Sequence, residues 1–498
     1  MRKLVSLMLV LAALTAFSSG EVFYEIKADK EEALVNTTLK LSCSPGEGQC
    51  PVNRWRLSWD LPDGATIRSI HDSIGEINDY QRQGSEVRIV TNSGPRRTSE
   101  TVKISAIIRK DAEEIHRGLY MRRMNLAGFK GQRTQGVVEN PEIISGWVGR
   151  NFETFFTASN MTFSGTGSTT VRINFGTGNK TRYYEFFGGN PENTSKAYEI
   201  SVGMTGLTQA FTRFPVALMK PENYENSVVD WSAGEYVGGS FRMRKNLGED
   251  FLPVLAHETV HGLNERKLKW DSTSSTWFDE GTAKYVESMV QLHLRGKGKT
   301  RKLFGEDTVY YERRNGTRYR ITAPSSGERD ELWAYYQQDK EFMKYWNPSA
   351  YPDQRSFGYA YSELIIRNYV VNMNGTLREL YRQIRPRDEI DSSEEKWMMM
   401  SEYLDLTPCK YSERQRFEKC LKNINSYNYS IYRAENISRS TDTITLEPLG
   451  IKRTEEGKRL NLTDEDYRFG RESKFERRIS SFLAAVRDFF LSWLGGVK

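Results

Sequence analysis

The stretch LAHETVHGLNE, Leu255–Glu265, places His257 and His261 four residues apart. The chain has only five histidines in 498 residues, so this spacing is informative by itself. On a helix, residues i and i+4 share a face, and two imidazoles there can reach one ion. Zinc in a catalytic site takes three protein ligands and a water, and Glu258 is placed to accept the proton of that water. The alternative is a structural histidine pair that binds no metal.

Local signals predict the helix that this spacing needs. Asp250 can cap its start, and Pro253 falls in its first turn. No helix breaker stands between Pro253 and Gly262. The two histidines are therefore expected on one face of a helix that begins near Asp250.

The segment WFDEGTAKYVESMV, Trp277–Val290, offers a third ligand. Glu280 follows His261 with eighteen residues between them and stands in an Asp-Glu-Gly turn. This His-Glu-x-x-His motif with a distal glutamate resembles the gluzincin metallopeptidases, specifically the aminopeptidase N and glycyl aminopeptidase families. The resemblance implies one Zn²⁺ per chain, held by His257, His261 and Glu280 in a thermolysin-like unit.

Three further residues match positions around the ligands in those families. Glu287, seven residues after Glu280, stands where a glutamate orients a zinc histidine. Asp279 stands where asparagine is common, and we place it with Glu287 around the ligands. Asn264, three residues after His261, matches the His-x-x-Asn pattern of the glycyl aminopeptidases.

The resemblance also implies a tyrosine that donates a hydrogen bond to the tetrahedral oxyanion. The segment FGYAYSELIIRNYVVNMNGTLRELYRQI, Phe357–Ile384, has the expected tyrosine turn and apolar helix. Matching the helix puts Tyr359 in this role, with Ser362 where a glycine usually stands. Tyr361 is the competitor, and the alternative for both is ordinary half-buried packing.

One element of the family is missing. The glutamate that grips the free amine of the substrate should lie in a Gly-x-Met-Glu-Asn strand before the zinc helix. The segment there, GEYVGGSFRMRKN, Gly234–Asn246, reads as an edge strand in which Gly238 and Gly239 could approach an extended peptide. It has no glutamate at the expected position, and the spacing does not support Glu235 as a substitute.

The same stretch carries Arg242 and Arg244. These cations would favour acidic groups in a substrate unless they face solvent. Specificity for the amino terminus of a peptide is therefore less firmly predicted than zinc-dependent hydrolysis.

Residues 1–20 combine a basic start, an apolar run and small residues, which is typical of a secretory signal. The four cysteines form two close pairs, Cys43 with Cys50 and Cys409 with Cys420. Each pair suits a local disulfide in an oxidising compartment, and free buried thiols are the alternative. We therefore expect a secreted, extracellular protein, with attachment to the outer cell surface as a variant of this expectation.

Sequons of the type Asn-x-Ser/Thr support export, because glycosylation marks the outer surface of secreted proteins. The nine candidates are Asn36, Asn160, Asn179, Asn193, Asn315, Asn374, Asn428, Asn436 and Asn461.

The pattern along the chain predicts a multidomain α+β fold. Short alternating strands indicate an amino-terminal β-sandwich-like domain. A helix, GLTQAFTRF, and an apolar strand, PVALM, then open the thermolysin-like zinc catalytic domain, and a helical carboxy-terminal part follows. The predicted boundaries are 1–20 for the signal, 21–196 for the β-rich domain, 197–294 for the catalytic core, 295–450 for a helical region completing the active site, 451–476 for a charged linker and 477–498 for an amphipathic tail helix.

Two amphipathic segments leave alternatives open. The aromatic residues of Glu331–Trp346 either wall a substrate cleft or simply pack. The tail 477–498 has an apolar stripe interrupted by Arg487 and Asp488, which suits a membrane surface better than a span, or else it docks on the protein. The net charge of +6 comes with a mixed surface and no nucleic-acid signature, so no nucleic acid is expected as a partner.

These features together predict a secreted or surface-attached zinc metallopeptidase that acts on a peptide or protein substrate as a monomer. Glu258 is expected to act as general base and Tyr359 as oxyanion donor. The aminopeptidase reading competes with an endopeptidase of the same clan. It also competes with a surface binding or adhesion protein that has a vestigial zinc site.

Overall fold

Strands in the first part of the chain alternate buried and less buried residues, because successive side chains point to opposite faces of a sheet. In β2 (Ala33–Ser42), every second residue from Ala33 to Leu41 is buried. The buried faces of three sheets share one hydrophobic core. The computed structural model describes residues 19–43, 50–149, 151–157, 159–209, 211, 213–228, 232–268, 272–295, 306–312, 318–324, 346–348, 355–373, 375–384, 399–408, 437–439 and 444–446.

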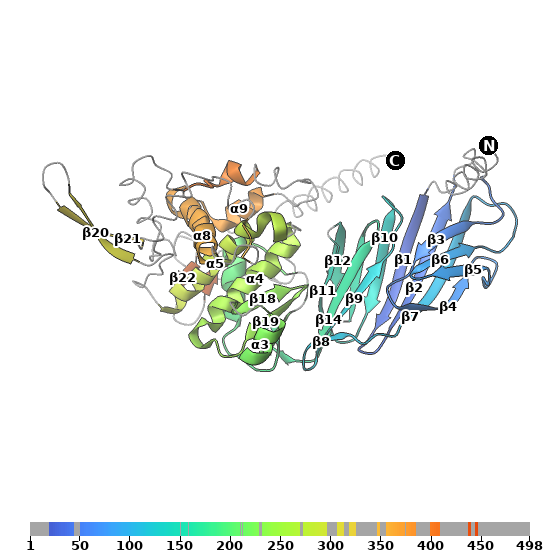
Figure 1. Cartoon of the computed structure of the whole chain (residues 1–498), viewed down its shortest axis with the longest axis horizontal. Helices are drawn as coiled ribbons and strands as arrows, with labels where there is room; N and C mark the ends of the chain where they lie inside the picture. The colour runs from blue at the N-terminus through green and yellow to red at the C-terminus, as the bar shows by residue number, and fades with distance from the viewer. Residues whose placement is uncertain are drawn as a thin grey trace, which may run out of the picture. The chain divides into compact units, whose positions relative to one another are not determined.

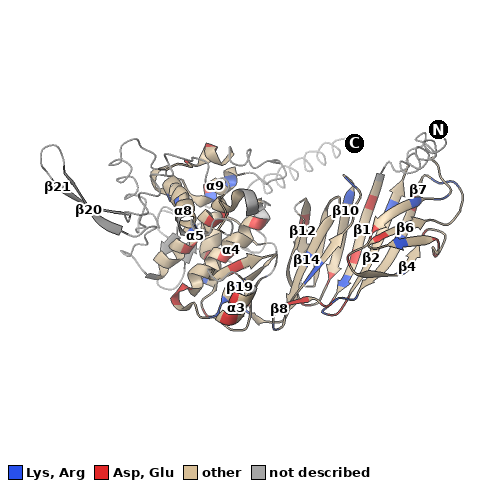
Figure 2. Cartoon of the chain, viewed as in Figure 1, with Lys and Arg blue, Asp and Glu red and all other residues tan. Residues whose placement is uncertain are grey.

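The three sheets of this core have seven, four and three strands and are mostly antiparallel (Figure 1). Their orders are β12-β13-β10-β1-β2-β7-β4, β11-β14-β9-β8 and β3-β6-β5. β1 pairs in parallel with β10 and antiparallel with β2. Basic and acidic residues are interspersed along these strands (Figure 2). The other strands are β1 (Ser19–Ala28), β3 (Arg56–Asp60), β4 (Ala65–His71), β5 (Tyr80–Gln83), β6 (Glu86–Val90), β7 (Ser99–Ile108), β8 (Glu113–His116), β9 (Leu119–Leu126), β10 (Arg133–Glu139), β11 (Ile143–Val148), β12 (Phe152–Phe156), β13 (Asn160–Thr166) and β14 (Thr169–Gly176).

A five-stranded sheet follows, in the order β15-β16-β17-β19-β18. β16, β17 and β19 run parallel, and β18 is the edge strand. Every residue of β17 is buried, as expected for the apolar run PVALM. The elements are β15 (Asn179–Lys180), β16 (Tyr184–Phe187), β17 (Phe214–Met219), α3 (Pro221–Ser227), β18 (Gly234–Val237) and β19 (Ser240–Arg244).

Helices dominate the rest of the described chain. α4 packs against α2 and α5, and α5 packs against α8. A Cβ on Gly281 of α5 would lie 2.6 Å from the carbonyl oxygen of Ser362 on α8, so glycine lets the two helix backbones approach closely. The helices are α2 (Ser195–Thr205), α4 (Phe251–Leu268), α5 (Ser272–Arg295), α8 (Arg355–Asn372) and α9 (Leu377–Gln383), with a 3₁₀ turn, η1 (Gly248–Asp250), before α4.

The chain divides into two units. The first comprises Met1–Pro191, Ala210–Asp230 and Val237–Lys245, and the second comprises Glu192–Gln209, Trp231–Tyr236 and Asn246–Lys498. A mostly β amino-terminal part with helices after it agrees with the predicted α+β class. β17 and β19 group with the first unit, and the boundaries drawn from the sequence remain predictions.

The predicted helix GLTQAFTRF was wrong. Gly206 has φ +71° and ends α2 in the left-handed conformation, so the helix precedes this segment. The region 295–450 was predicted to be helical, with a short β-like segment, DTITLEPLGI, near its end. It also contains a hairpin of β20 (Glu306–Glu312) and β21 (Arg318–Pro324), which was not expected. A short pair of β22 (Ile437–Arg439) and β23 (Ile444–Leu446) follows, and β23 falls in the β-like segment.

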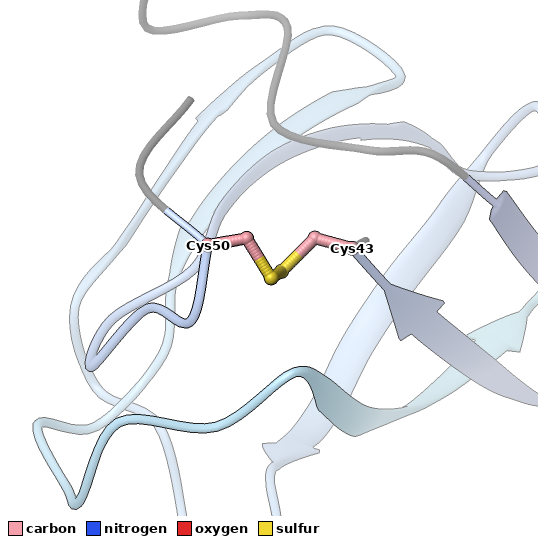
Figure 3. Close-up of a disulfide and its surroundings, with 2 residues drawn as sticks. All are labelled: Cys43 and Cys50. Carbon is pink, nitrogen blue, oxygen red and sulfur yellow. A yellow bond between two sulfur atoms is a disulfide. The ribbon is translucent and has the colours of Figure 1, made fainter. Parts of the chain in front are cut away.

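Cys43 and Cys50 form a disulfide with a Cα–Cα distance of 5.9 Å (Figure 3), as predicted. Cys409, Cys420, the linker and the tail 477–498 lie outside the described residues. β1 begins at Ser19, so the last two residues of the predicted signal belong to a strand. Within the described part of the chain, no helix is long and apolar enough to cross a membrane.

The structure describes four of the nine sequons. Asn179 and Asn193 are exposed, whereas Asn36 and Asn160 are half-buried in strands. The remaining candidates, Asn315, Asn374, Asn428, Asn436 and Asn461, lie outside the described residues, and modification of all nine stays a prediction.

Candidate metal centre

Helices α4 and α5 bring the three predicted ligands to one point. His257 and His261 lie one turn apart on α4, and their Nε2 atoms are 3.0 Å apart. Oε2 of Glu280 on α5 lies 3.3 Å from Nε2 of His257 and 3.5 Å from Nε2 of His261. The helical conformation of α5 is interrupted at Ser275, so Glu280 lies shortly after this break.

The three atoms fit a zinc ion. In a tetrahedral site with metal–ligand distances of about 2.1 Å, neighbouring ligand atoms lie about 3.4 Å apart. The separations here are 3.0, 3.3 and 3.5 Å, close to that edge length. Two imidazole nitrogens and one carboxylate oxygen are also a donor set that catalytic zinc sites use. His257, His261 and Glu280 therefore form a group that can hold Zn²⁺.

The second nitrogen of each imidazole meets a carboxylate. Nδ1 of His257 lies 3.1 Å from Oε2 of Glu287, and Nδ1 of His261 lies 2.9 Å from Oδ2 of Asp279. An Nδ1–H that donates to a carboxylate fixes the ring and leaves Nε2 for a metal. The structure thus brings both supporting carboxylates of the sequence analysis into contact with the ligand histidines.

A buried network holds Asp279. Nδ2 of Asn264 donates to Oδ1 of Asp279 at 2.7 Å and to Oγ1 of Thr282 at 3.2 Å. The hydroxyl of Tyr381 on α9 donates to Oδ1 of Asn264 at 2.6 Å. Sequence reasoning singled out Asn264 and missed Thr282 and Tyr381. Tyr381 lies 117 residues from its partner, and no local signal connects them.

Burial and the charges of the neighbouring groups together set the pKa of each ligand. Burial alone would lower the pKa of His261, but Asp279 and Glu280 raise it well above its ordinary value. Burial likewise opposes charge on His257, and Glu280 and Glu287 raise its pKa. Burial would raise the pKa of Glu280, but the two imidazoles outweigh burial and lower it. The negative charges that favour protonated imidazoles would also stabilise a bound divalent metal ion such as Zn²⁺.

Glu258 is 4% exposed and lies beside the ligands. Burial raises its pKa, the two imidazoles lower it, and the charges of Glu280 and Glu235 raise it, which leaves the pKa at about 7. A carboxyl group with this pKa can accept and release a proton near neutral pH. This is the property that a general base needs.

Strand β18 approaches the carboxylate of Glu258. A Cβ on Gly234 would lie only 2.7 Å from Oε1 of Glu258, so the strand passes close to this side chain. The hydroxyl of Tyr236 donates to a carboxylate oxygen of Glu265 and ties the strand to α4. Glu235 stands between these two residues, and its charge acts on Glu258.

The spacing of the sequence does not support Glu235 as an amine anchor, but its charge raises the pKa of Glu258. The sequence feature that could have identified Glu235 is its place after a glycine, 22 positions before His257, on the strand that precedes the zinc helix. The surrounding sequence Gly-Glu-Tyr departs from the family pattern, which concealed this signal.

The structure separates the two tyrosines of α8. The hydroxyl of Tyr359 lies 3.4 Å from Oε1 of Glu280. Burial raises its pKa, and the charges of Glu280 and Glu258 raise it further, so the phenol stays protonated. Tyr361 is fully buried, and its hydroxyl donates to the carbonyl oxygen of Leu406 at 3.1 Å. Tyr359 therefore lies at the metal centre, and Tyr361 belongs to the core.

Gly238 and Gly239 form the turn between β18 and β19, with φ of +55° and +86°, a conformation that favours glycine. The carbonyl of Gly238 accepts a hydrogen bond from Asn174 at 2.8 Å, and that of Gly239 accepts one from Ser145 at 2.7 Å. The structure gives both glycines a role in the turn, and their binding of substrate stays a prediction.

The two arginines of β19 have acidic partners in the protein. Arg242 pairs with Glu113 at 3.5 Å, and Arg244 pairs with Glu225 at 3.4 Å. Arg244 also lies over the ring of Tyr224, 5.2 Å from its centroid. Both arginines thus have acidic partners within the protein, and an acidic group on a substrate is not needed to explain their charges.

Comparison with known proteins adds distant structural likenesses. No protein-family model and no curated protein sequence matches the chain. An M1 zinc metallopeptidase from Deinococcus radiodurans is similar at 10% identity and a TM-score of 0.32, over 82% of this chain and 94% of that chain. Yeast LTA4 hydrolase in complex with bestatin is similar at 10% identity and a TM-score of 0.32, over 78% of this chain and 65% of that chain. The structural neighbours are thus zinc metallopeptidases and LTA4 hydrolase, while the zinc-binding geometry rests on the contacts within this chain.

Proposed function

We propose that the protein is a zinc metallopeptidase that removes residues from the amino termini of peptides. One observation carries this proposal. His257, His261 and Glu280 converge at zinc-compatible distances beside a buried glutamate, Glu258, whose pKa is about 7. A structural zinc site closes its coordination with four protein ligands and needs no general base, whereas three ligands leave a position for water.

The residues of the site divide the chemistry among them. Bound zinc would supply a water of lowered pKa and positive charge near the scissile carbonyl. Glu258 accepts the proton of the attacking water and returns it to the departing amine. The protonated hydroxyl of Tyr359 donates a hydrogen bond to the oxygen that becomes negative in the transition state. Glu287 and Asp279 hold the imidazoles in register.

Glu235 supplies the group that an aminopeptidase needs for the substrate amine. Its charge raises the pKa of Glu258 from the neighbouring strand, β18. A protonated α-amine placed there would gain a charge-assisted hydrogen bond. β18 is an edge strand, so its backbone can also pair with an extended substrate. An endopeptidase would use the edge strand without the amine contact.

We further propose that the protein acts outside the cell as a monomer. The amino-terminal signal pattern, the Cys43–Cys50 disulfide and the exposed sequons support export. Contact of the tail 477–498 with a membrane surface remains part of this proposal.

The test is cleavage of one peptide pool in two forms, with free and with acetylated amino termini, read by mass spectrometry. Glu258→Ala serves as the blank. Loss of single residues from the free pool alone is expected. Internal cuts in both pools would replace the proposal with an endopeptidase. If zinc-loaded protein and blank behave alike, peptide hydrolysis is refuted, and a surface binding protein with a vestigial site becomes the better description.

A further inference from the structure

Lys284 lies on α5 between Glu287, which contacts the ligand His257, and Tyr359, the proposed oxyanion donor. Its Nζ is 2.7 Å from Oε2 of Glu287, the oxygen that also meets Nδ1 of His257. The same Nζ lies over the ring of Tyr359, 5.6 Å from the centroid. One ammonium group thus contacts two parts of the centre that come from different helices.

These contacts close a loop around the ligands. From His257 it runs through Glu287 and Lys284 to Tyr359, whose hydroxyl lies 3.4 Å from Oε1 of Glu280. A cation held by a carboxylate cannot move freely, so it offers the face of the ring a fixed charge. Cations within about 6 Å of an aromatic centroid are attracted to the ring.

Trp346 packs closely against the ring of Tyr359. Its ring meets that of Tyr359 edge to face at 5.3 Å, and its side chain is almost fully buried. A Cβ on Gly358 would lie 2.0 Å from the indole, so the residue before Tyr359 leaves room for the tryptophan. Trp346 limits the movement of the ring by packing, and Lys284 adds an electrostatic contact.

We propose that Lys284 is a positioning residue that orients Tyr359 for the oxyanion and ties it to the carboxylate supporting His257. The proposal rests on the proposed peptidase function and adds a residue that the zinc motif does not contain. Lys284 acts through Tyr359 and Glu287 and does not itself touch the reacting atoms. Its effect is therefore expected on the transition state more than on substrate binding.

Lys284→Met tests this role, because methionine keeps the length of the side chain and removes its charge. In zinc-loaded protein we expect kcat to fall about tenfold, at the lower end of the effects seen for residues that support metal ligands, with KM within about twofold. Lys284→Arg should retain most of the activity. In the Tyr359→Phe background, Lys284→Met should cause little further loss, because the tyrosine hydroxyl through which it acts is gone.

A second readout does not depend on turnover. Calorimetry should show that Lys284→Met weakens binding of a phosphinic dipeptide, a mimic of the tetrahedral transition state, by about the same factor as kcat. Zinc content and melting temperature report whether the variant folds and loads normally. Lys196→Met, which removes a lysine charge from α2, is the matched control.

Three outcomes are distinguishable. Wild-type kinetics and phosphinic peptide binding in Lys284→Met would overturn the positioning role while leaving the peptidase intact. An equal loss with and without the Tyr359 hydroxyl would also overturn it, because the lysine would then act through Glu287 alone and would not position the tyrosine. If zinc-loaded wild type neither cleaves peptides nor binds the phosphinic dipeptide, the peptidase function fails first, and the role of Lys284 fails with it.

Discussion

Gly234 on β18 and Glu258 on α4 lie so close that a methyl group cannot be placed between them. A Cβ on Gly234 would lie 2.7 Å from Oε1, 3.0 Å from Cγ of Glu258 and 3.0 Å from a methyl group of Val254. Glu258, the proposed general base, is thus held against the strand that carries Glu235. The backbone of β18 therefore limits where the carboxylate of Glu258 can lie, which bears on its proposed role in proton transfer.

Gly234→Ala should therefore displace the carboxylate of Glu258. A shift of about 1 Å in a reacting group can cost about a hundredfold in rate, so we expect kcat to fall by ten- to a hundredfold. Steady-state kinetics with a free-amine peptide measures this effect. Gly75→Ala is the matched control, because a Cβ there meets no atom within 4 Å. Equal kcat in both variants would show that Glu258 does not need its present position.

Glu235→Gln should have two effects that separate amine binding from acid–base chemistry. Loss of a charge-assisted contact worth about 1.5–3 kcal/mol should lower kcat/KM for free-amine peptides about ten- to a hundredfold. Acetylated peptides should lose much less. Unchanged selectivity between the two peptide forms would exclude Glu235 as the amine anchor.

The same variant should shift the pH profile. Glu258 works as a carboxylate, so activity falls as pH falls through its pKa, and the charge of Glu235 raises that pKa. Removing the charge lowers the pKa, and the acidic limb of kcat/KM should move to lower pH. A limb that stays in place, or moves to higher pH, would contradict the electrostatic link between the two carboxyl groups.

The two tyrosines of α8 should behave differently when each loses its hydroxyl. Tyr359→Phe should reduce kcat by about a hundred- to a thousandfold, as loss of an oxyanion donor does elsewhere. Tyr361→Phe should leave kcat near the wild-type value and cost about 1 kcal/mol of unfolding free energy, because the carbonyl of Leu406 loses its donor. Kinetics and thermal unfolding of both variants check this, and the reverse pattern would assign the role to Tyr361.

The ligands were predictable from sequence because their geometry is local. The spacing of His257 and His261 fixes both on one helical face, and family resemblance identified Glu280, Glu287 and Tyr359. Non-local partners left no such signal. The hydrogen bond from Tyr381 to Asn264 depends on how helices far apart in sequence pack, and the contact of Lys284 with Tyr359 depends on how α5 meets α8.

The strands and helices show the same contrast between features that a local pattern predicts and features that it does not. The apolar strand before β19 was predicted because a continuous apolar run suits a buried parallel strand. The helix before it was misplaced because Gly206 was read as part of the helix, whereas its left-handed φ ends α2 there. Apolar periodicity alone does not reveal on which side of a glycine a helix lies. The glycine pair after β18 was expected within one edge strand, and it forms the turn between β18 and β19.

Zinc binding should release protons, because the metal must displace those that the carboxylates retain on the imidazoles. The pKa of His261 is raised well above 6.5 and that of His257 above 6.5, so both hold protons at lower pH in the metal-free protein. These raised values stabilise the metal-free fold below pH 6.5, and the stabilisation is lost as pH rises through the folded pKa values. Zinc competes with the same protons, so its apparent affinity should rise with pH.

Calorimetric titration of metal-free protein at pH 6 and pH 8, in buffers of different ionisation enthalpy, measures both quantities. At pH 6 the imidazoles should release up to two protons per zinc, one from each ring, and their share should be smaller at pH 8. Glu258→Gln controls for the proton of the general base, since it leaves the three ligands in place. A binding heat that does not depend on the buffer at pH 6 would mean that the imidazoles are neutral before zinc arrives. The carboxylates around them would then stabilise the bound metal without first retaining protons.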